Sequence, residues 1–374
     1  MELETLFSPK KIGNVEIKNR IMRSPTFVAR ASEDGFLTDD YINYYTEVAK
    51  GGVGLLTPGT MLIDQAGAGI AKAPCLYDDK FIEGHKRFVN SVHENSEAKV
   101  ASQINHTGNN AGKPGVELVG PSAKWNPAFK KECRELTAAE IEQIIKNFVE
   151  GGRRVYESGY DLVELHGAHG FLLSDFVSPF ANTRSDDYGG TTEGRCKILV
   201  DIYNGLRDIT DKNFPILIKL NVQDYLPGGL TFEGGKEIVK ILIETGFDAI
   251  EISCGRTSTK FTGGKRYPAL TVSSPEEENF FLPFAKELKP LMKDQPIILM
   301  GGIRNPITAD EILRKNYADF VSMGRPFIHE PDLPNRWKSG DLSPAKCISC
   351  NQCFTTQRPG PVYCVVKRKA EETS

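Results

Sequence analysis

The sequence has no long hydrophobic run and no strong excess of either charge. No apolar stretch approaches the ~18 residues of a membrane-spanning helix, so we expect no membrane anchor. The formal net charge is −3, which predicts no binding to nucleic acid or to an acidic membrane surface. The first residues, MELETLFSPKK, lack the apolar core of a secretory signal. We therefore expect a soluble protein of a reducing, cytoplasmic compartment.

A second absence is the glycine-rich loop of dinucleotide-binding sheets. No Gly-x-Gly-x-x-Gly follows a predicted strand, which argues against a doubly wound nucleotide-binding fold. Short apolar runs rich in β-branched residues instead alternate with amphipathic segments. Such runs are typical of strands that are covered on both faces of a parallel sheet. The eight runs are Ile21–Pro25, Val53–Thr57, Lys99–Ile104, Leu162–His166, Ile216–Leu220, Ala249–Ser253, Pro296–Met300 and Asp319–Met323.

Amphipathic helices are expected between these strands. Thr137 and Glu140 form a capping-box pattern that opens a predicted helix over Thr137–Ser158. Thr231 opens another such segment, and two more are expected at Pro275–Met292 and Thr308–Lys315.

Eight strands that alternate with helices predict an α/β fold, a single (β/α)8 TIM barrel over residues 1–340. The alternative is a doubly wound open sheet. Residues 341–374 are expected to form a short C-terminal extension. Two long connections, residues 105–135 and 255–274, follow strands and are expected to overhang the catalytic face.

Half of the eight cysteines lie close together near the C-terminus. Thiolates at this spacing can surround one metal centre, either a [4Fe–4S] cluster or a tetrahedral zinc ion. A disulfide pair is not expected in a reducing compartment. The predicted metal ligands are Cys347, Cys350, Cys353 and Cys364, whereas Cys75, Cys133, Cys196 and Cys254 are expected to be ordinary buried thiols.

Several polar residues and glycines fall at the C-terminal ends of the predicted strands, where TIM barrels place their active sites. Gly301, Gly302 and Gly324 would let backbone N–H groups approach an anion, and Arg325 offers a fork to phosphate oxygens. These positions predict a phosphate site. The alternative is that the glycines only allow tight turns.

Side chains at the other strand ends could carry chemistry. His166 and His169 could donate hydrogen bonds to one substrate oxygen, or they could be a structural pair or metal ligands. Lys219 could form a Schiff base, or it could be a fixed positive charge that stabilises an anionic cofactor ring. Gln103 could hydrogen-bond to the same ring. Further candidates at these ends are Ser24, Pro25, Thr26 and Thr60.

These residues resemble the Old Yellow Enzyme family of FMN-dependent oxidoreductases. The resemblance covers Leu6 to about Asp332 and nearly the whole predicted barrel. It rests on Leu6–Pro9, Lys18–Arg20, Gln103, His166-x-x-His169-Gly170, Ser178-Pro179, the stretch Asn182–Gly190, Gly302 and Gly324-Arg325.

The cysteine cluster is similar to the one in 2,4-dienoyl-CoA reductases and trimethylamine dehydrogenases of this family. In those relatives it holds a [4Fe–4S] cluster beside the FMN barrel, so the resemblance favours iron–sulfur over zinc. This chain ends ten residues after Cys364, and we therefore expect it to lack the further nucleotide-binding domains of those relatives.

The resemblance also implies a role for each site residue. FMN would lie across the barrel mouth, with Lys219 near flavin N1 and Gly301, Gly302, Gly324 and Arg325 at the phosphate. The flavin ring would contact Ser24, Pro25, Thr26, Phe27, Thr60, Gln103 and His166. The implied catalytic residues are His166, His169 and Thr26, and the histidines would anchor the acceptor oxygen of a substrate stacked on the flavin.

The implied activity is that of an NAD(P)H-dependent ene-reductase. Hydride would pass from flavin N5 to an activated C=C bond of an α,β-unsaturated carbonyl compound or acid. Phe171 stands where many relatives have a proton-donating tyrosine, and Tyr225 is a possible replacement. One alternative is an amine or other oxidative dehydrogenase that passes electrons through the [4Fe–4S] cluster to a separate electron-transfer protein. Two more are a non-redox Schiff-base lyase that uses Lys219 and a non-enzymatic nucleotide-binding barrel.

Overall fold

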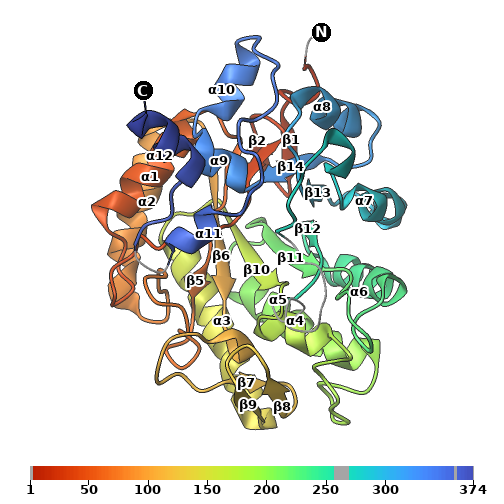
Figure 1. The fold of residues 1–374 in the computed structure, drawn as a ribbon. Helices are drawn as coiled ribbons and strands as arrows, with labels where there is room; N and C mark the ends of the chain where they lie inside the picture. Colours follow the sequence, from red (N-terminus) through yellow and green to blue (C-terminus); the bar gives the residue numbers. More distant parts are fainter. Residues whose placement is uncertain (1–2, 257–268, 358–359, 374) are drawn as a thin grey trace.

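The computed structural model is a closed barrel of parallel strands surrounded by helices (Figure 1). It describes residues 3–256, 269–357 and 360–373. The barrel strands are β3 (Ile21–Arg23), β4 (Leu55–Leu56), β6 (Lys99–Asn105), β10 (Leu162–Gly167), β11 (Ile216–Asn221), β12 (Ala249–Ser253), β13 (Ile297–Met300) and β14 (Phe320–Met323). Each strand pairs in parallel with the next, and a pairing of β10 with β6 closes the ring. The predicted barrel and its eight strands are confirmed.

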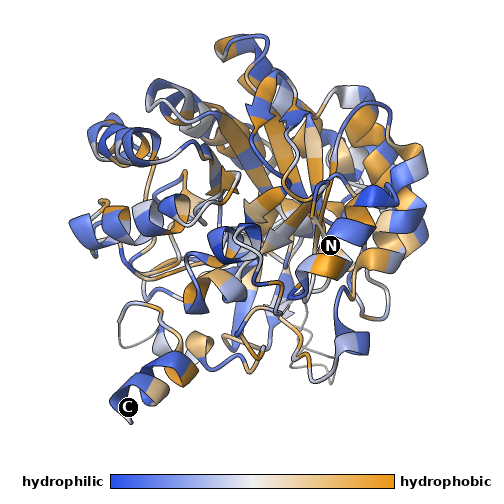
Figure 2. Cartoon of the chain, turned by 90° about the horizontal axis from the view of Figure 1, so that it is seen from above, coloured by the Kyte–Doolittle hydropathy of each residue, from blue (hydrophilic) through white to orange (hydrophobic). Residues whose placement is uncertain are grey.

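Helices follow the strands and cover the outside of the barrel. Thr137 accepts from the N–H of Glu140, whose side chain bonds back to the cap, and this confirms the predicted capping box. Thr231 caps α6 by accepting from the N–H of Gly234, without a reciprocal bond. The main helices are α1 (Asp39–Lys50), α2 (Ile82–Asn95), α3 (Ala138–Glu157), α4 (Leu172–Val177), α5 (Thr192–Ile209), α6 (Phe232–Thr245), α8 (Pro306–Arg314), α9 (Arg325–His329) and α10 (Leu333–Lys338). Figure 2 shows apolar strands inside a ring of amphipathic helices. Within the described ranges, no helix is long and apolar enough to cross a bilayer.

The predicted helix Pro275–Met292 is wrong. The structure has three short pieces there, namely η4 (Pro275–Glu277), α7 (Leu282–Leu288) and η5 (Lys289–Leu291). Asn279 adopts a left-handed conformation with φ 56°, which interrupts the helical backbone. Pro290 lacks the N–H that a continuing α-helix requires, and α7 ends just before it.

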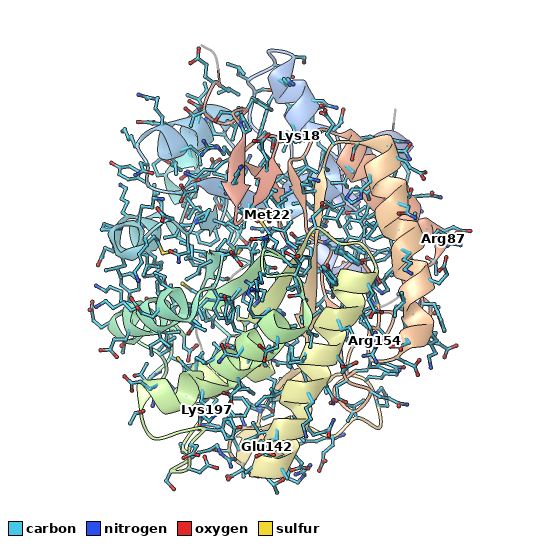
Figure 3. All side chains as sticks on the ribbon, turned by 180° about the vertical axis from the view of Figure 1, so that it is seen from behind. Lys18, Met22, Arg87, Glu142, Arg154 and Lys197 are labelled. Atoms are coloured by element: carbon cyan, nitrogen blue, oxygen red, sulfur yellow. The ribbon has the colours of Figure 1, made fainter. Side chains whose placement is uncertain are left out.

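The end of the barrel where the strands begin is closed by an apolar plug. The hairpin of β1 (Lys10–Ile12) and β2 (Val15–Ile17) places Ile12 and Ile17 against inward-facing residues of the barrel strands. Met22 belongs to this cluster and lies at the centre of the view from behind, whereas Arg87, Arg154 and Lys197 lie on outer helices (Figure 3).

The next inward-facing positions are polar. Side chains along a strand alternate between its faces, so the residues two positions beyond the plug also face the interior. In TIM barrels these layers are dominated by branched apolar residues. Here the buried residues at these positions include Ser24, Gln103, Glu164, Lys219, Glu251 and Ser322.

The C-terminal extension crosses the barrel mouth. The backbone N–H of Ala345 donates to the carbonyl of Arg304, and that of Val362 donates to the carbonyl of Val28. The extension contains α11 (Cys353–Thr356) and α12 (Val365–Glu372). The division of the chain at residue 340 stays a prediction.

The connection over residues 105–135 contains a small sheet that the sequence did not predict. Its strands are β7 (Val119–Gly120), β8 (Lys124–Asn126) and β9 (Lys131–Glu135), while β5 (Met61–Leu62) extends β6 at the barrel rim. The second long connection, residues 255–274, lies largely outside the described residues, which omit 257–268.

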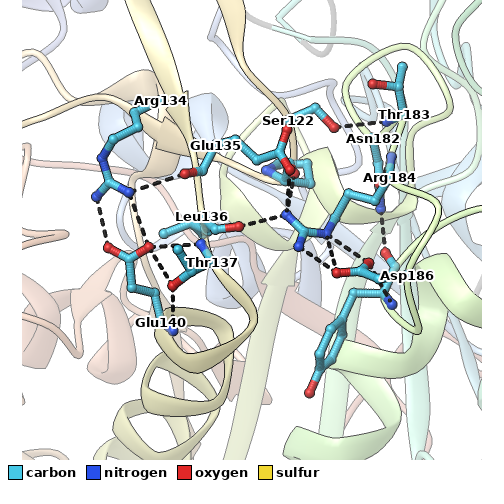
Figure 4. A network of polar contacts seen from close by, with 12 residues as sticks. Ser122, Arg134, Glu135, Leu136, Thr137, Glu140, Asn182, Thr183, Arg184 and Asp186 are labelled. Atoms are coloured by element: carbon cyan, nitrogen blue, oxygen red, sulfur yellow. Dashed lines mark hydrogen bonds and ion pairs between the residues drawn. The ribbon is translucent and has the colours of Figure 1, made fainter.

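Arg184 fastens this small sheet to the barrel (Figure 4). Its Nη1 donates to the carbonyls of Pro121 at 2.8 Å and Leu136 at 2.6 Å. Its side chain is 6% exposed and also pairs with Asp186. One guanidinium thus satisfies two backbone carbonyls that lie far from it in sequence.

We predict that Arg184→Ala lowers the free energy of unfolding by about 2–3 kcal/mol, because it leaves buried carbonyls and a carboxylate without a donor. Arg134→Ala is the matched control, since Arg134 is 44% exposed and pairs only at the surface. It should cost less than about 1 kcal/mol. Urea denaturation measures both values, and equal losses would contradict the role of Arg184.

Candidate active site

A cavity of about 430 Å³ opens at the C-terminal ends of the barrel strands. This volume lies in the range of about 300–1,000 Å³ that ligand pockets usually have. The predicted cofactor and catalytic residues all line it, namely Ser24, Pro25, Thr26, Phe27, Thr60, Gln103, His166, His169, Lys219, Gly301, Gly302, Gly324 and Arg325. The structure therefore brings together side chains that are spread over 300 residues of sequence.

Lys219 lies at the floor of this cavity and is 2% exposed. Its Nζ stands 3.0 Å from Glu251 Oε2 and donates to Ser24 Oγ at 2.9 Å. Glu251 Oε1 accepts hydrogen bonds from Ser24 Oγ and Ser322 Oγ at 2.9 and 2.7 Å. The ammonium is thus held in place by a buried counter-ion and a hydroxyl group.

Gln103 lines the cavity from β6. Its amide Nε2 donates to Glu164 Oε2 at 2.9 Å. Burial, and then the charge of Glu251, raise the pKa of Glu164 well above its ordinary value. Gln103 thus contacts a carboxyl group whose environment favours its protonated form.

The two histidine rings are hydrogen-bonded to each other. His166 Nε2 lies 3.2 Å from His169 Nδ1, and His169 Nε2 lies 2.7 Å from Ser253 Oγ. The backbone N–H of His169, which has φ 66°, donates to Asn221 Oδ1. The buried His166 Nδ1 has no hydrogen-bond partner within the structure. The partners of His169 fix the orientation of its ring.

Both histidine rings are neutral at ordinary pH. Burial, and then the charge of Lys219, lower the pKa of His166 to about 3. Burial, followed by the influence of His166, lowers the pKa of His169 well below its ordinary value. Neutral imidazoles can donate one hydrogen bond each and accept another.

Phe171 also lines the cavity, and its ring centroid lies 4.7 Å from that of His166. A phenylalanine ring has no proton to donate. Tyr225, the proposed replacement acid, is not among the described residues that line the cavity. It packs instead against Phe284, at a centroid distance of 6.4 Å.

The wall opposite the histidines is made of glycines and arginines. Gly301 and Gly302 have φ values of 116° and 76°, conformations that disfavour any residue with a Cβ atom. A Cβ on Gly324 would come within 2.8 Å of Thr26 Oγ1. Arg325 lines the cavity, but its Nη1 donates to the Ser349 carbonyl at 3.1 Å and to Asn351 Oδ1 at 2.6 Å.

The sequence missed the contribution of the C-terminal extension to this wall. Ser349, Phe354 and Gln357 line the cavity, as does Arg304 after β13. The hydrogen bonds between Arg325 and the extension form only in the fold. The spacing of the cysteines gives no signal for these neighbours.

The four predicted metal ligands line a second, small cavity of about 20 Å³. Cys347 and Cys353 are buried and Cys350 and Cys364 half-buried; none of the four forms a disulfide, and Cys364 Sγ lies 3.1 Å from His329 Nδ1. Within the described part of the chain, no three His, Cys, Asp or Glu side chains are placed to hold a single metal ion. The four thiols are therefore not arranged as in a tetrahedral zinc site, whose sulfur atoms lie about 3.8 Å apart because Zn–S bonds are ~2.3 Å long. The four thiols line the small cavity, and Arg325 lines both this cavity and the larger one.

Comparison with known proteins identifies the family. Residues 5–342 match the model of the NADH:flavin oxidoreductase / NADH oxidase family. An NADH oxidase of Thermoanaerobacter brockii is 36% identical over 352 residues, which are 92% of this chain and 52% of the relative. An NADPH dehydrogenase of Geobacillus sp. (strain WCH70) is 32% identical over 332 residues, 88% of this chain and 92% of the relative.

The solved structure of an old yellow enzyme homologue from Zymomonas mobilis has a TM-score of 0.76 and 26% identity. It covers 91% of this chain and 94% of its own. The chain spans about half the length of the NADH oxidase but nearly all of the NADPH dehydrogenase. The chain therefore belongs to the NADH:flavin oxidoreductase / NADH oxidase family, which confirms the resemblance to the Old Yellow Enzymes that its motifs indicated.

Proposed function

We propose that this chain is an FMN-dependent NAD(P)H oxidoreductase of the ene-reductase type, which acts on activated C=C bonds of α,β-unsaturated carbonyl compounds or acids. The observation that carries the proposal is the single cavity that collects the predicted cofactor and catalytic residues above a buried lysine. The NADPH dehydrogenase that the chain nearly spans supports the choice of electron donor.

The residues present fit a bound FMN. Two buried polar atoms of the cavity, Thr60 Oγ1 and His166 Nδ1, have no partner within the chain, as expected where a ligand supplies one. Gly301, Gly302 and Gly324 line the cavity with backbone, which a phosphate could approach. Lys219 and Gln103 would face the ring. When bound, FMN would supply the hydride-transfer chemistry that side chains lack.

The protein residues would position and polarise the substrate. His166 and His169 are neutral, and Ser253 holds the ring of His169. His166 Nδ1, which has no partner within the chain, would donate a hydrogen bond to an acceptor oxygen. His169, whose ring nitrogens contact His166 and Ser253, would join it by exchanging one of these partners for the ligand. Thr26 would lie beside the same ligand. Lys219 would supply positive charge to an electron-rich ring at the cavity floor. Phe171 would exclude water over His166, so the proton that completes a reduction comes from another group.

We further propose that Cys347, Cys350, Cys353 and Cys364 hold a [4Fe–4S] cluster. A set of four free thiols around one cavity fits this centre, and a bound cluster would supply one-electron transfer. The C-terminal extension, residues 341–374, would then act as a cofactor-binding segment.

A second candidate function is an amine or other oxidative dehydrogenase that passes electrons to a separate protein. It is favoured by Phe171, which replaces the usual acid, and by Arg325, which lines both cavities. The Schiff-base lyase gains no support, because Lys219 is paired with Glu251, whereas a nucleophilic lysine must be neutral.

The first prediction concerns the flavin itself. Purified protein should carry or take up FMN, and NADH or NADPH should bleach its visible absorption under anaerobic conditions. An enone should then restore the absorption, whereas the corresponding saturated ketone should not, because it has no activated C=C bond. A colourless protein that cannot be reconstituted with FMN would contradict both candidate functions.

The second prediction concerns the histidine pair. His166→Ala and His169→Ala should weaken the binding of a saturated ketone analogue about tenfold, the equivalent of one hydrogen bond, while FMN remains bound. Because burial lowers the pKa of His166 to about 3, its ring stays neutral and binding in the native protein should not change between pH 5 and pH 8. Perturbation of the flavin spectrum measures both effects.

His93→Ala is the control for this experiment, since His93 lies on α2 and contacts Asp161 at the surface. Loss of FMN without any effect on the ketone would rule out the proposed role of the pair.

The third prediction concerns the cysteine segment. Cys350→Ser should lose iron and sulfide, because a serine hydroxyl is a poor replacement for a thiolate ligand. It should also weaken FMN binding, since Ser349, Phe354 and Gln357 of the same segment line the flavin cavity. Cys133→Ser, in the small sheet, is the control and should keep its iron. Unchanged iron content in Cys350→Ser would refute the ligand assignment.

A further inference from the structure

The polar layer of the barrel contains one more acidic group than its cation can neutralise. Glu164 on β10 and Glu251 on β12 are both fully buried, and Lys219 on the strand between them, β11, is the basic group of the layer. Nζ of Lys219 pairs with Glu251. If both carboxyl groups were ionised, a dry interior would hold an uncompensated negative charge, which is costly.

The contacts of the two carboxyl groups leave one oxygen of Glu164 without a donor. Glu164 Oε2 accepts from Gln103, and Glu251 Oε1 accepts from two serines. Of the remaining oxygens, Glu164 Oε1 has no hydrogen-bond partner and Glu251 Oε2 lies 3.0 Å from Lys219 Nζ. Glu164 on β10 and Glu251 on β12 flank Lys219 on β11, and a hydrogen bond between the two carboxyl groups is among the causes that raise the pKa of Glu164. Two carboxylate oxygens repel unless a proton lies between them.

We propose that Glu164 and Glu251 share one proton beneath the cavity, and that Glu164 is thereby a positioning residue for Gln103. A proton on Glu164 makes the layer neutral, with Lys219 and Glu251 as its single ion pair. The Glu164 carbonyl oxygen then accepts the Gln103 Nε2–H. Gln103 Oε1 is left as the amide atom that a ligand in the cavity can use.

Burial and Glu251 favour the protonated form of Glu164, while the charge of Lys219 and the hydrogen bond from Gln103 act against it. The groups that face it are Gln103 from β6, Lys219 from β11 and Glu251 from β12. Ser24, which follows β3, and Ser322 of β14 donate hydrogen bonds to the other Glu251 oxygen. The pKa of Glu164, which burial and Glu251 raise, points the same way. Since this pKa is raised, the carboxyl group loses its proton at a higher pH than an ordinary glutamate does.

The shared proton predicts how substitutions behave. Glu164→Gln keeps the layer neutral and keeps an acceptor for Gln103, because an amide resembles a protonated carboxyl group. In Glu251→Gln, Glu164 becomes the only counter-ion of Lys219 and gives up its proton. Either change therefore removes the protonated glutamate.

Infrared spectroscopy of protein labelled with 13C-carboxyl glutamate tests the shared proton directly. The isotope shift separates glutamate carboxyl bands from those of a bound flavin. Aspartates carry no label, and the buried Asp175, whose pKa burial raises to about 6, is ionised at pH 8. We expect a protonated-glutamate band in the native protein, its loss in Glu164→Gln and Glu251→Gln, and its retention in the control Glu330→Gln, at a buried glutamate paired with Arg336. Absence of the band from the native protein, or its persistence in Glu164→Gln, would overturn the proposal.

FMN affinity tests the positioning role, which rests on the proposed function. Glu164→Gln should bind FMN within about twofold of the native protein, whereas Glu164→Leu should lose about tenfold, because Gln103 then lacks its acceptor. Equal affinities of the two variants would overturn the positioning role. If the native protein binds no FMN, the proposed function fails, and the infrared experiment still decides the shared proton. If the variants do not fold, the native spectrum at pH 8 still decides against the proposal when it lacks the band.

Discussion

The site depends on the placement of one ammonium group inside the barrel. A buried charge is tolerated only when it is paired and hydrogen-bonded, so Lys219 requires Glu251 on the next strand and Ser24 across the barrel. These partners replace the apolar side chains that normally fill this layer of a TIM barrel. The apolar plug of β1 and β2 below the layer keeps the interior closed to water. The cavity floor is therefore polar, charged and rigid.

The barrel was predictable because its signal is local. Apolar runs and the capping box at Thr137 depend on residues close together in sequence, and the structure confirms them. The helix expected over Pro275–Met292 failed because Asn279 and Pro290 break its backbone. The small sheet over residues 105–135 was missed because its short strands are held by distant groups such as Arg184.

The site was predictable in its members and not in its contacts. The resemblance identified residues that prove to line one cavity. It gave no indication that His169 would bond to Ser253 or that Arg325 would bond to the cysteine loop, since these contacts join distant strand ends. Glu164 and Glu251 were hidden within apolar runs. The alternation of inward- and outward-facing side chains along each strand could have identified them, because a charged residue that faces inward from a buried strand must have a partner.

The central claim is that the Lys219 charge acts on a flavin bound above it. The most direct test is the midpoint potential of the bound FMN in the native protein, in Lys219→Met and in Lys219→Arg. A positive charge beside the ring favours its reduced, more negative form. We therefore expect Lys219→Met to lower the potential and Lys219→Arg to keep it close to the native value. An unchanged potential in Lys219→Met, with FMN still bound, would contradict the account.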